Sequence, residues 1–103
     1  MTFAPIQKSV DDWIRNYTPG YFQPLQMIAR LAEELGELSR AVSYRFGEKK
    51  PKPAEEISEV ADELCDLIFV AICLANSMKI DLDTEWMSLL SKLQERDADR
   101  WKS

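Results

Sequence analysis

Apolar side chains recur every three or four residues along most of this chain, a spacing that places them on one face of an α-helix. Four such segments can be followed, over residues 3–17, 25–42, 57–74 and 86–93. They are separated by Thr18-Pro19-Gly20, a lysine-rich segment at 47–53 and helix-capping residues at 81–84. Only 3 glycines and 5 prolines occur in 103 residues, too few for the turns of a sheet. The sequence therefore predicts an all-α fold, an antiparallel four-helix bundle, in a single domain spanning residues 1–103.

Missing residue types exclude several kinds of site. Histidine is absent, which excludes Ser-His-Asp catalysis, two-histidine zinc sites and the Glu-x-x-His di-iron bundle.

The charge balance excludes other kinds of partner. Acidic residues outnumber basic ones by 18 to 13, and the net charge of −5 argues against binding to nucleic acid polymers or anionic membranes. The longest apolar run, at 67–75, is about half the ~18 residues of a membrane span.

The third predicted helix, expected to begin near Ala54, carries both cysteines and the most apolar stretch of the chain. Cys65 and Cys73 would lie about 12 Å apart along it, beyond the ~7 Å that a disulfide allows. We therefore expect free thiols in small core positions and a cytoplasmic protein. Because the second half of this helix is apolar all round, it should be buried on every face. In so small a chain, that predicts a homo-oligomer, a dimer or a dimer of dimers.

Acidic residues on the second and third predicted helices share one spacing. Glu34 and Glu37 lie three residues apart, as do Glu63 and Asp66, so each pair shares a helix face. Leucines beside each pair place the acids at the edge of the packed seam. No basic residue is interleaved to neutralise them, and Arg30 and Arg40 are the nearest cations on the second helix. On antiparallel helices the four carboxylates can converge, and such a cluster persists when a hard divalent cation binds it. Ligands that are all oxygen favour Mg²⁺ or Mn²⁺.

Spacing alone leaves two alternatives open. The acids can form an ordinary solvated helix face, and Glu59 with Asp62 gives a second acidic pair one turn earlier. Gly36, beside Glu37, favours a functional site, because glycine within a helix costs up to ~1 kcal/mol relative to alanine. A close helix crossing or a tight metal site would explain it.

The residues around these acids resemble one known family. The segments Arg30-Leu-Ala-Glu-Glu-Leu-Gly-Glu-Leu-Ser-Arg-Ala-Val42 and Glu63-Leu-Cys-Asp-Leu-Ile-Phe69 are similar to the E-E-x-x-E and E-x-x-D motifs of the MazG-type nucleoside triphosphate pyrophosphohydrolases. The resemblance covers roughly residues 3–96 and is strongest to the short single-domain members. It assigns the third-helix pair to Glu63 and Asp66, since an apolar run follows the aspartate of the family directly.

The resemblance implies an enzyme that hydrolyses nucleoside triphosphates, including deoxy or non-standard ones, to the monophosphate and pyrophosphate as nucleotide-pool house-cleaning. Glu34, Glu37, Glu63 and Asp66 would hold Mg²⁺, the metal would bridge the triphosphate, and water would attack the α-phosphorus. Glu33 is a candidate base for that water and would equally suit an exposed surface position.

Further candidates concern binding of the substrate. The positions that could contact phosphates, on the last helix and near the end of the third, are Lys92, Arg96, Asn76 and Lys79. Ser91 stands where the family commonly has an asparagine. Trp13 could form an aromatic platform for the base, or pack in the core. Lysines 49, 50 and 52 could touch phosphates or form a solvated loop.

Two functions without turnover are the alternatives to an enzyme. One is an acidic helical bundle that dimerises and docks a basic partner. The other is a metal-dependent nucleotide sensor. An acidic bundle that docks a partner would not explain why a glycine stands at position 36 within a helix, whereas a metal site would.

Overall fold

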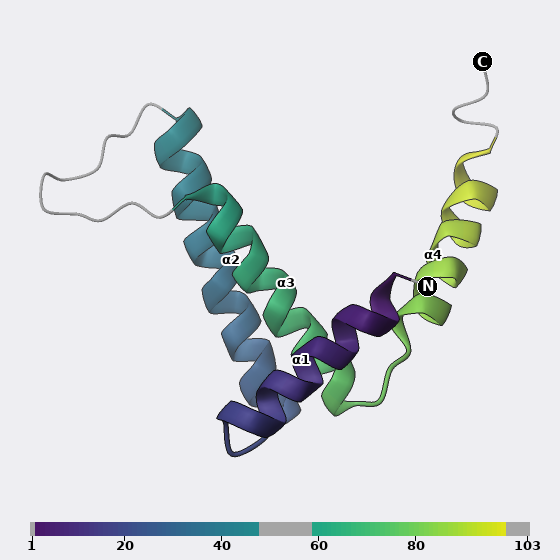
Figure 1. The fold of residues 1–103 in the computed structure, drawn as a ribbon. Coiled ribbons are helices and arrows are strands. Elements are labelled where there is room, and N and C mark those ends of the chain that lie inside the picture. Colours follow the sequence, from purple (N-terminus) through teal and green to yellow (C-terminus); the bar gives the residue numbers. More distant parts are fainter. Residues whose placement is uncertain (1, 48–58, 99–103) are drawn as a thin grey trace, which may run out of the picture.

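Four helices make up the described part of this computed structural model, which comprises residues 2–47 and 59–98 (Figure 1). They are α1 (Phe3–Tyr17), α2 (Pro24–Phe46), α3 (Val60–Ser77) and α4 (Leu82–Asp97). No strand occurs in these residues. The predicted all-α class and the number of helices are therefore confirmed. Lysines 49, 50 and 52 lie outside the described residues.

Local signals in the sequence explain the first helix boundaries. After α1, Thr18 donates both its backbone N–H and its hydroxyl to the carbonyl oxygen of Ile14. Pro24 opens α2, where its missing N–H does no harm. The expected start of the third helix near Ala54 differs from the observed start at Val60. Glu59, the residue before Val60, has extended backbone angles (φ −75°, ψ 143°), and 54–58 lie outside the described residues.

Two caps join α3 to α4. Lys79 takes a left-handed conformation (φ 57°), and the Ile80 N–H donates to the Ala75 carbonyl over 2.8 Å, which closes the end of α3 as a Schellman motif does. Asp81 then accepts hydrogen bonds from the backbone N–H groups of Asp83 and Thr84, so the predicted cap of the fourth helix is confirmed.

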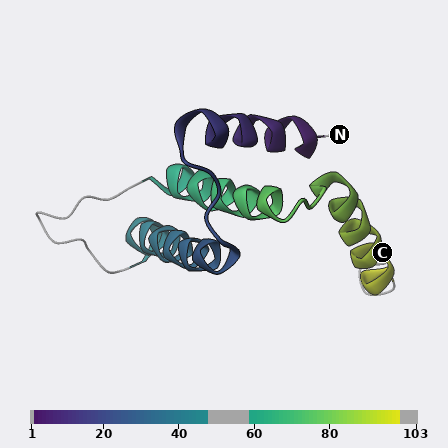
Figure 2. The ribbon, with the colours of Figure 1, turned by 90° about the horizontal axis from the view of Figure 1, so that it is seen from below.

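The helices form an open arrangement around α3. Figure 2 shows α3 between α1 and α2, and α2 and α3 run antiparallel over most of their lengths (Figure 1). Among the described residues, α4 packs mainly on α1 and diverges from α2. The radius of gyration is 17.3 Å, against about 13 Å for a compact domain of this length. The four helices of residues 2–47 and 59–98 therefore do not close into a compact bundle within one chain.

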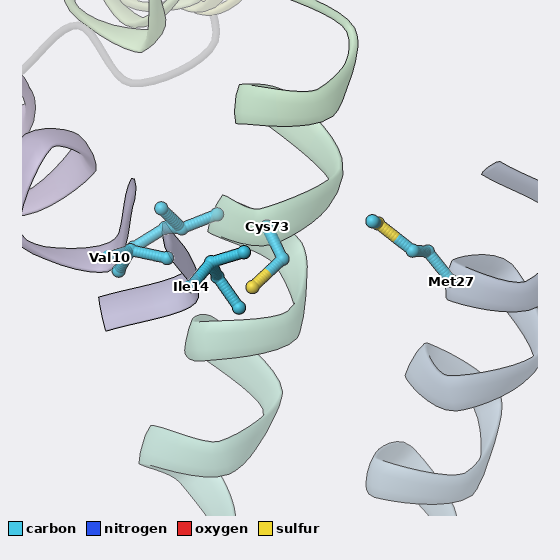
Figure 3. Packing of buried hydrophobic residues seen from close by; sticks show 5 residues of the cluster. Val10, Ile14, Met27 and Cys73 are labelled. Carbon is cyan, nitrogen blue, oxygen red and sulfur yellow. The ribbon is translucent and has the colours of Figure 1, made fainter. Parts of the chain in front are cut away.

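The buried core lies where α1, the start of α2 and the second half of α3 meet. Its residues are Val10, Ile14, Met27, Ile72 and Cys73. Figure 3 shows Val10 and Ile14 of α1 on one side of Cys73, with Met27 of α2 on the other. This packing fixes α1 and α2 on α3.

The two cysteines differ in burial. Both are free, as predicted, but only Cys73 is buried. The prediction of a core position for Cys65 is wrong, because the first half of α3 is covered by fewer helices than the second. Among the described residues, no helix combines the length and hydropathy needed to cross a membrane.

Candidate metal centre

Three carboxylates from two helices converge near the start of α3. Glu34 of α2, with Glu63 and Asp66 of α3, each offer an oxygen, and these three oxygens lie within 4.8 Å of one another. The antiparallel packing of α2 on α3 brings them together. The place of Glu63 in the first turn of α3 also favours negative charge, because helix N-termini carry a partial positive charge. We call these three residues the carboxylate cluster.

Glu63 is the most buried member of the carboxylate cluster. It is 9% exposed, and among the described residues no hydrogen bond or ion pair reaches its carboxylate. The Glu34 side chain is 13% exposed, whereas Asp66 is exposed. A buried carboxylate without a partner is costly, and two further carboxylates beside it add repulsion. Hard oxygen donors in this arrangement fit a divalent cation such as Mg²⁺.

Glu37, the fourth expected ligand, lies beside the cluster. Its carboxylate is exposed and pairs with Arg40, with 3.8 Å between Oε2 and Nη1. It follows Glu34 by one turn on the same helix face, where Cβ atoms are roughly 5–6 Å apart. The structure thus brings three of the four expected ligands together and leaves Glu37 one turn away.

Nothing packs closely against Gly36 in the described part of the chain. A Cβ added there would meet no atom within 4 Å. Of the two explanations expected for Gly36, the close helix crossing is therefore absent among the described residues, and the metal site stays a prediction.

The nearest expected cations, Arg30 and Arg40, do pair with acids of the second helix, so the expectation that Glu34 and Glu37 are not neutralised is wrong. Arg30 Nη2 lies 3.3 Å from Glu34 Oε1, and Arg30 Nη1 lies 3.6 Å from Glu33 Oε2. The spacing of four residues between Arg30 and Glu34 is the sequence signal that could have identified this pair.

The neighbouring acids lie outside the cluster. Glu33 is exposed on α2, with Arg30 as its ion-pair partner. Glu59, from the alternative register, pairs instead with Arg45 at 3.8 Å, and Asp62 is exposed. The geometry therefore groups Glu34 with the Glu63 and Asp66 pair.

A pocket of about 200 Å³ lies next to the cluster. It is lined by aromatic and apolar side chains from α1, the α1–α2 turn, α2 and α3, among them Trp13, Phe22, Phe69 and Cys73. Arg30 also lines it, so this guanidinium belongs to both the pocket and the cluster.

The expected aromatic platform, Trp13, lies at this pocket rather than in the core. It is 53% exposed and contacts the Tyr17 ring at 4.4 Å between centroids. Phe69 and Cys73 were missed as pocket residues, since they belong to an apolar run that reads as core. Burial raises the pKa of the Cys73 thiol, which keeps this part of the wall uncharged.

Asn76, a candidate for phosphate binding, joins α1 to α3. Its amide donates to the Gln7 carbonyl (2.9 Å) and to the Tyr21 hydroxyl (3.1 Å), and its oxygen accepts from the Gln7 side chain (2.9 Å). The Tyr21 hydroxyl donates to Asp11 over 2.7 Å. Burial, with this carboxylate, raises the pKa of Tyr21 to about 12, and the hydrogen bond lowers the pKa of Asp11. No periodicity signals such a network.

The remaining candidate cations lie away from the cluster in one chain. Lys79 is exposed in the turn that ends α3. Lys92 and Arg96 are exposed on α4, which diverges from α2 (Figure 1), and Arg96 pairs with Asp97 at 2.8 Å.

Comparison with known proteins gives consistent matches over most of the chain. The model of the MazG nucleotide pyrophosphohydrolase domain matches residues 22–101. The chain is similar to the uncharacterized protein YpjD of Bacillus subtilis (strain 168), with 46% identity over 100 residues, 97% of this chain and 90% of that protein.

Two solved structures are also similar. One is the Bacillus-conserved MazG protein, a nucleotide pyrophosphohydrolase, with a TM-score of 0.79, 42% identity and 96% of each chain covered. The other is YPJD from Bacillus subtilis, with a TM-score of 0.80, 45% identity, and 94% of this chain and 97% of that chain covered.

Proposed function

The chain belongs to the MazG nucleotide pyrophosphohydrolase family, and on this premise we propose that it hydrolyses nucleoside and deoxynucleoside triphosphates to the monophosphate and pyrophosphate with the help of Mg²⁺. Membership makes it a hydrolase of acid anhydrides. The observation that carries the proposal is the buried Glu63 carboxylate, which has two acidic neighbours and no basic partner of its own among the described residues.

Glu34, Glu63 and Asp66 would hold the cation, and Glu37 would join them by a rotation of its side chain. When bound, Mg²⁺ or Mn²⁺ would offset the negative charge of the triphosphate. Glu33 is the candidate that would orient or deprotonate the attacking water, since its carboxylate is exposed beside the cluster.

The pocket supports a place for the base. Trp13, Phe22 and Phe69 offer aromatic surface within it, and a planar base stacks well on such rings. A base held there would leave its phosphates directed past Arg30 to the carboxylate cluster.

A homo-oligomer is part of the proposal. Large apolar residues on α2 and the first half of α3 are exposed: Leu25, Ile28, Leu35, Val42, Phe46, Leu64 and Ile68. Those on α2 follow a heptad spacing, which is typical of a helix that packs on another helix. Since Lys92 and Arg96 lie away from the cluster of their own chain, they would reach phosphates only if a second copy supplied them.

The decisive experiment measures pyrophosphate release from a panel of ribo- and deoxynucleoside triphosphates, with Mg²⁺, with Mn²⁺ and with EDTA. We expect release that requires the divalent cation. Tight binding of a triphosphate without release would indicate a nucleotide sensor, and neither binding nor release would leave an interaction module. Activity on deoxy or non-standard triphosphates, together with a cytoplasmic location, would support a house-cleaning role.

The oligomer is tested separately by analytical ultracentrifugation. We expect a dimer or a dimer of dimers at micromolar concentration, and we expect Leu35→Asp to dissociate it. Asn16→Asp, which adds the same single negative charge on the exposed side of α1, is the matched control. Only 12 kDa species for the unmodified chain would remove this part of the proposal.

A further inference from the structure

We propose that Arg30 is a substrate-binding residue that exchanges partners: it pairs with Glu34 in the metal-free protein and moves to the phosphates of the nucleotide once the carboxylate cluster holds a cation. This inference rests on the function proposed above and deepens it. It concerns a residue that is not one of the acidic motif positions.

The position of Arg30 means that its guanidinium needs to move only a short distance to exchange partners. Its guanidinium contacts Glu34 at 3.3 Å and Glu33 at 3.6 Å, and the same side chain lines the neighbouring pocket. Because Arg30 both lines the pocket and contacts the cluster, it would lie within reach of a nucleotide with its base in the pocket and its phosphates at the cluster. No other basic residue lines the pocket in the described part of the chain.

Charge balance supplies the direction of the exchange. In the metal-free protein Arg30 is the cation that pairs with the carboxylate cluster among the described residues, so it offsets part of the repulsion there. A divalent cation at Glu34 would repel the guanidinium and compete for the same carboxylate oxygens. A triphosphate provides several anionic oxygens at the same place, and the planar guanidinium can bind two of them at once.

The proposal predicts effects of opposite sign from one substitution. Arg30→Gln removes the competitor for Glu34, so Mn²⁺ binding without nucleotide, measured by electron paramagnetic resonance, should tighten by about threefold. The same variant should bind the α,β-methylene analogue of the best substrate, measured calorimetrically with Mg²⁺, about tenfold more weakly or worse. A purely structural role of Arg30 would not move the two affinities in opposite directions.

Two further variants complete the test. Arg30→Lys keeps the charge without the planar fork, so it should leave Mn²⁺ affinity near the wild-type value and weaken analogue binding several-fold. Arg45→Gln is the control, because Arg45 is an exposed residue of α2 that pairs with Glu59 and does not line the pocket. It should change neither the Mn²⁺ affinity nor the analogue affinity.

The outcomes separate this inference from the proposed function. Analogue affinity within twofold of wild type in Arg30→Gln, or weaker Mn²⁺ binding in that variant, would overturn the partner exchange even if the wild-type protein releases pyrophosphate. A wild-type protein that releases no pyrophosphate from any triphosphate would instead overturn the proposed function.

Discussion

Two carboxylates in this molecule are equally buried and differ in what surrounds them. Glu63 and Asp83 are each 9% exposed. Asp83 Oδ1 and Oδ2 accept hydrogen bonds from the backbone N–H groups of Phe3 and Ala4, over 2.9 and 3.0 Å. The Glu63 carboxylate has no such donor among the described residues and faces two more acids. Burial alone therefore does not distinguish a structural acid from a ligand, whereas the presence of donors does.

The same contrast extends to the two ends of α3. At its C-terminal end, Asn76 and Tyr21 have mutually compatible donors and acceptors that tie α1 to α3. At its N-terminal end, like charges meet with one nearby guanidinium as compensation. The first arrangement stabilises the fold, and the second costs stability that a bound cation would return.

The largest expected effect is on catalysis at the unpaired acid. Glu63→Gln should lower pyrophosphate release by at least about a hundredfold, because even residues that only support metal ligands are worth about 10–100-fold. The matched control is Glu59→Gln, an acid one turn earlier on the chain that pairs with Arg45 and lies outside the cluster. Activity that falls equally in both variants would contradict the assignment of Glu63.

The next effect concerns stability with and without Mg²⁺. If Mg²⁺ binds only the folded protein, it should add about 2.7 kcal/mol to the free energy of unfolding at a concentration of 100 times its Kd. Glu63→Gln should gain less from Mg²⁺, and its metal-free melting temperature should exceed that of the wild type, since repulsion in the cluster is relieved. A lower metal-free melting temperature in this variant would mean that the cluster is not repulsive.

At the paired acid, the expected effect is on folding instead. Asp83→Ala leaves two N–H groups at the start of α1 without acceptors, which should cost about 2 kcal/mol of unfolding free energy, or roughly 10 °C in melting temperature. Activity per folded molecule should be unchanged. Glu85→Ala, an exposed substitution on the same helix, should stay within about 0.5 kcal/mol of wild type in urea unfolding.

Features that depend on local spacing in the sequence were predicted correctly. Helical spacing located all four helices, and Thr18, Pro24 and Asp81 marked boundaries correctly because capping is a local interaction. The spacing of Glu63 and Asp66 indicated a shared face, and their meeting with Glu34 required only that α2 and α3 be antiparallel.

What the sequence could not predict depends on contacts between distant segments. The cap that Asp83 provides for α1 joins residues about 80 positions apart, and no pattern of spacing encodes it. The direction of α4 likewise depends on its packing on α1, a helix far from it in the sequence. Pocket residues such as Phe69 looked like core because composition does not distinguish an apolar wall from an apolar interior.

The smallest expected effect is at the Tyr21 hydroxyl. Tyr21→Phe should cost about 1 kcal/mol of unfolding free energy near neutral pH, because Asp11 and Asn76 lose a partner. The pKa of Tyr21 is raised from its usual value near 10 to about 12, so the protonated hydroxyl stabilises the fold fully below pH 10. That contribution should fall as pH rises from 10 to 12.

The measurement for Tyr21 is the difference in unfolding free energy between wild type and Tyr21→Phe as a function of pH. It should shrink across this alkaline range. A difference that stays constant up to pH 12 would show that the hydroxyl does not titrate as described.

The length of α3 has a consequence for how the molecule tolerates change. Asn76 follows Glu63 by thirteen positions of α3, a rise of about 20 Å. This is more than twice the ~8 Å screening length of charges at physiological ionic strength. Substitutions at the two ends should therefore act independently, with free energies that add. Substitutions at the acid-rich end of α3 can therefore change which ion or nucleotide is bound without weakening the hydrogen bonds of Asn76 that hold α1 on α3.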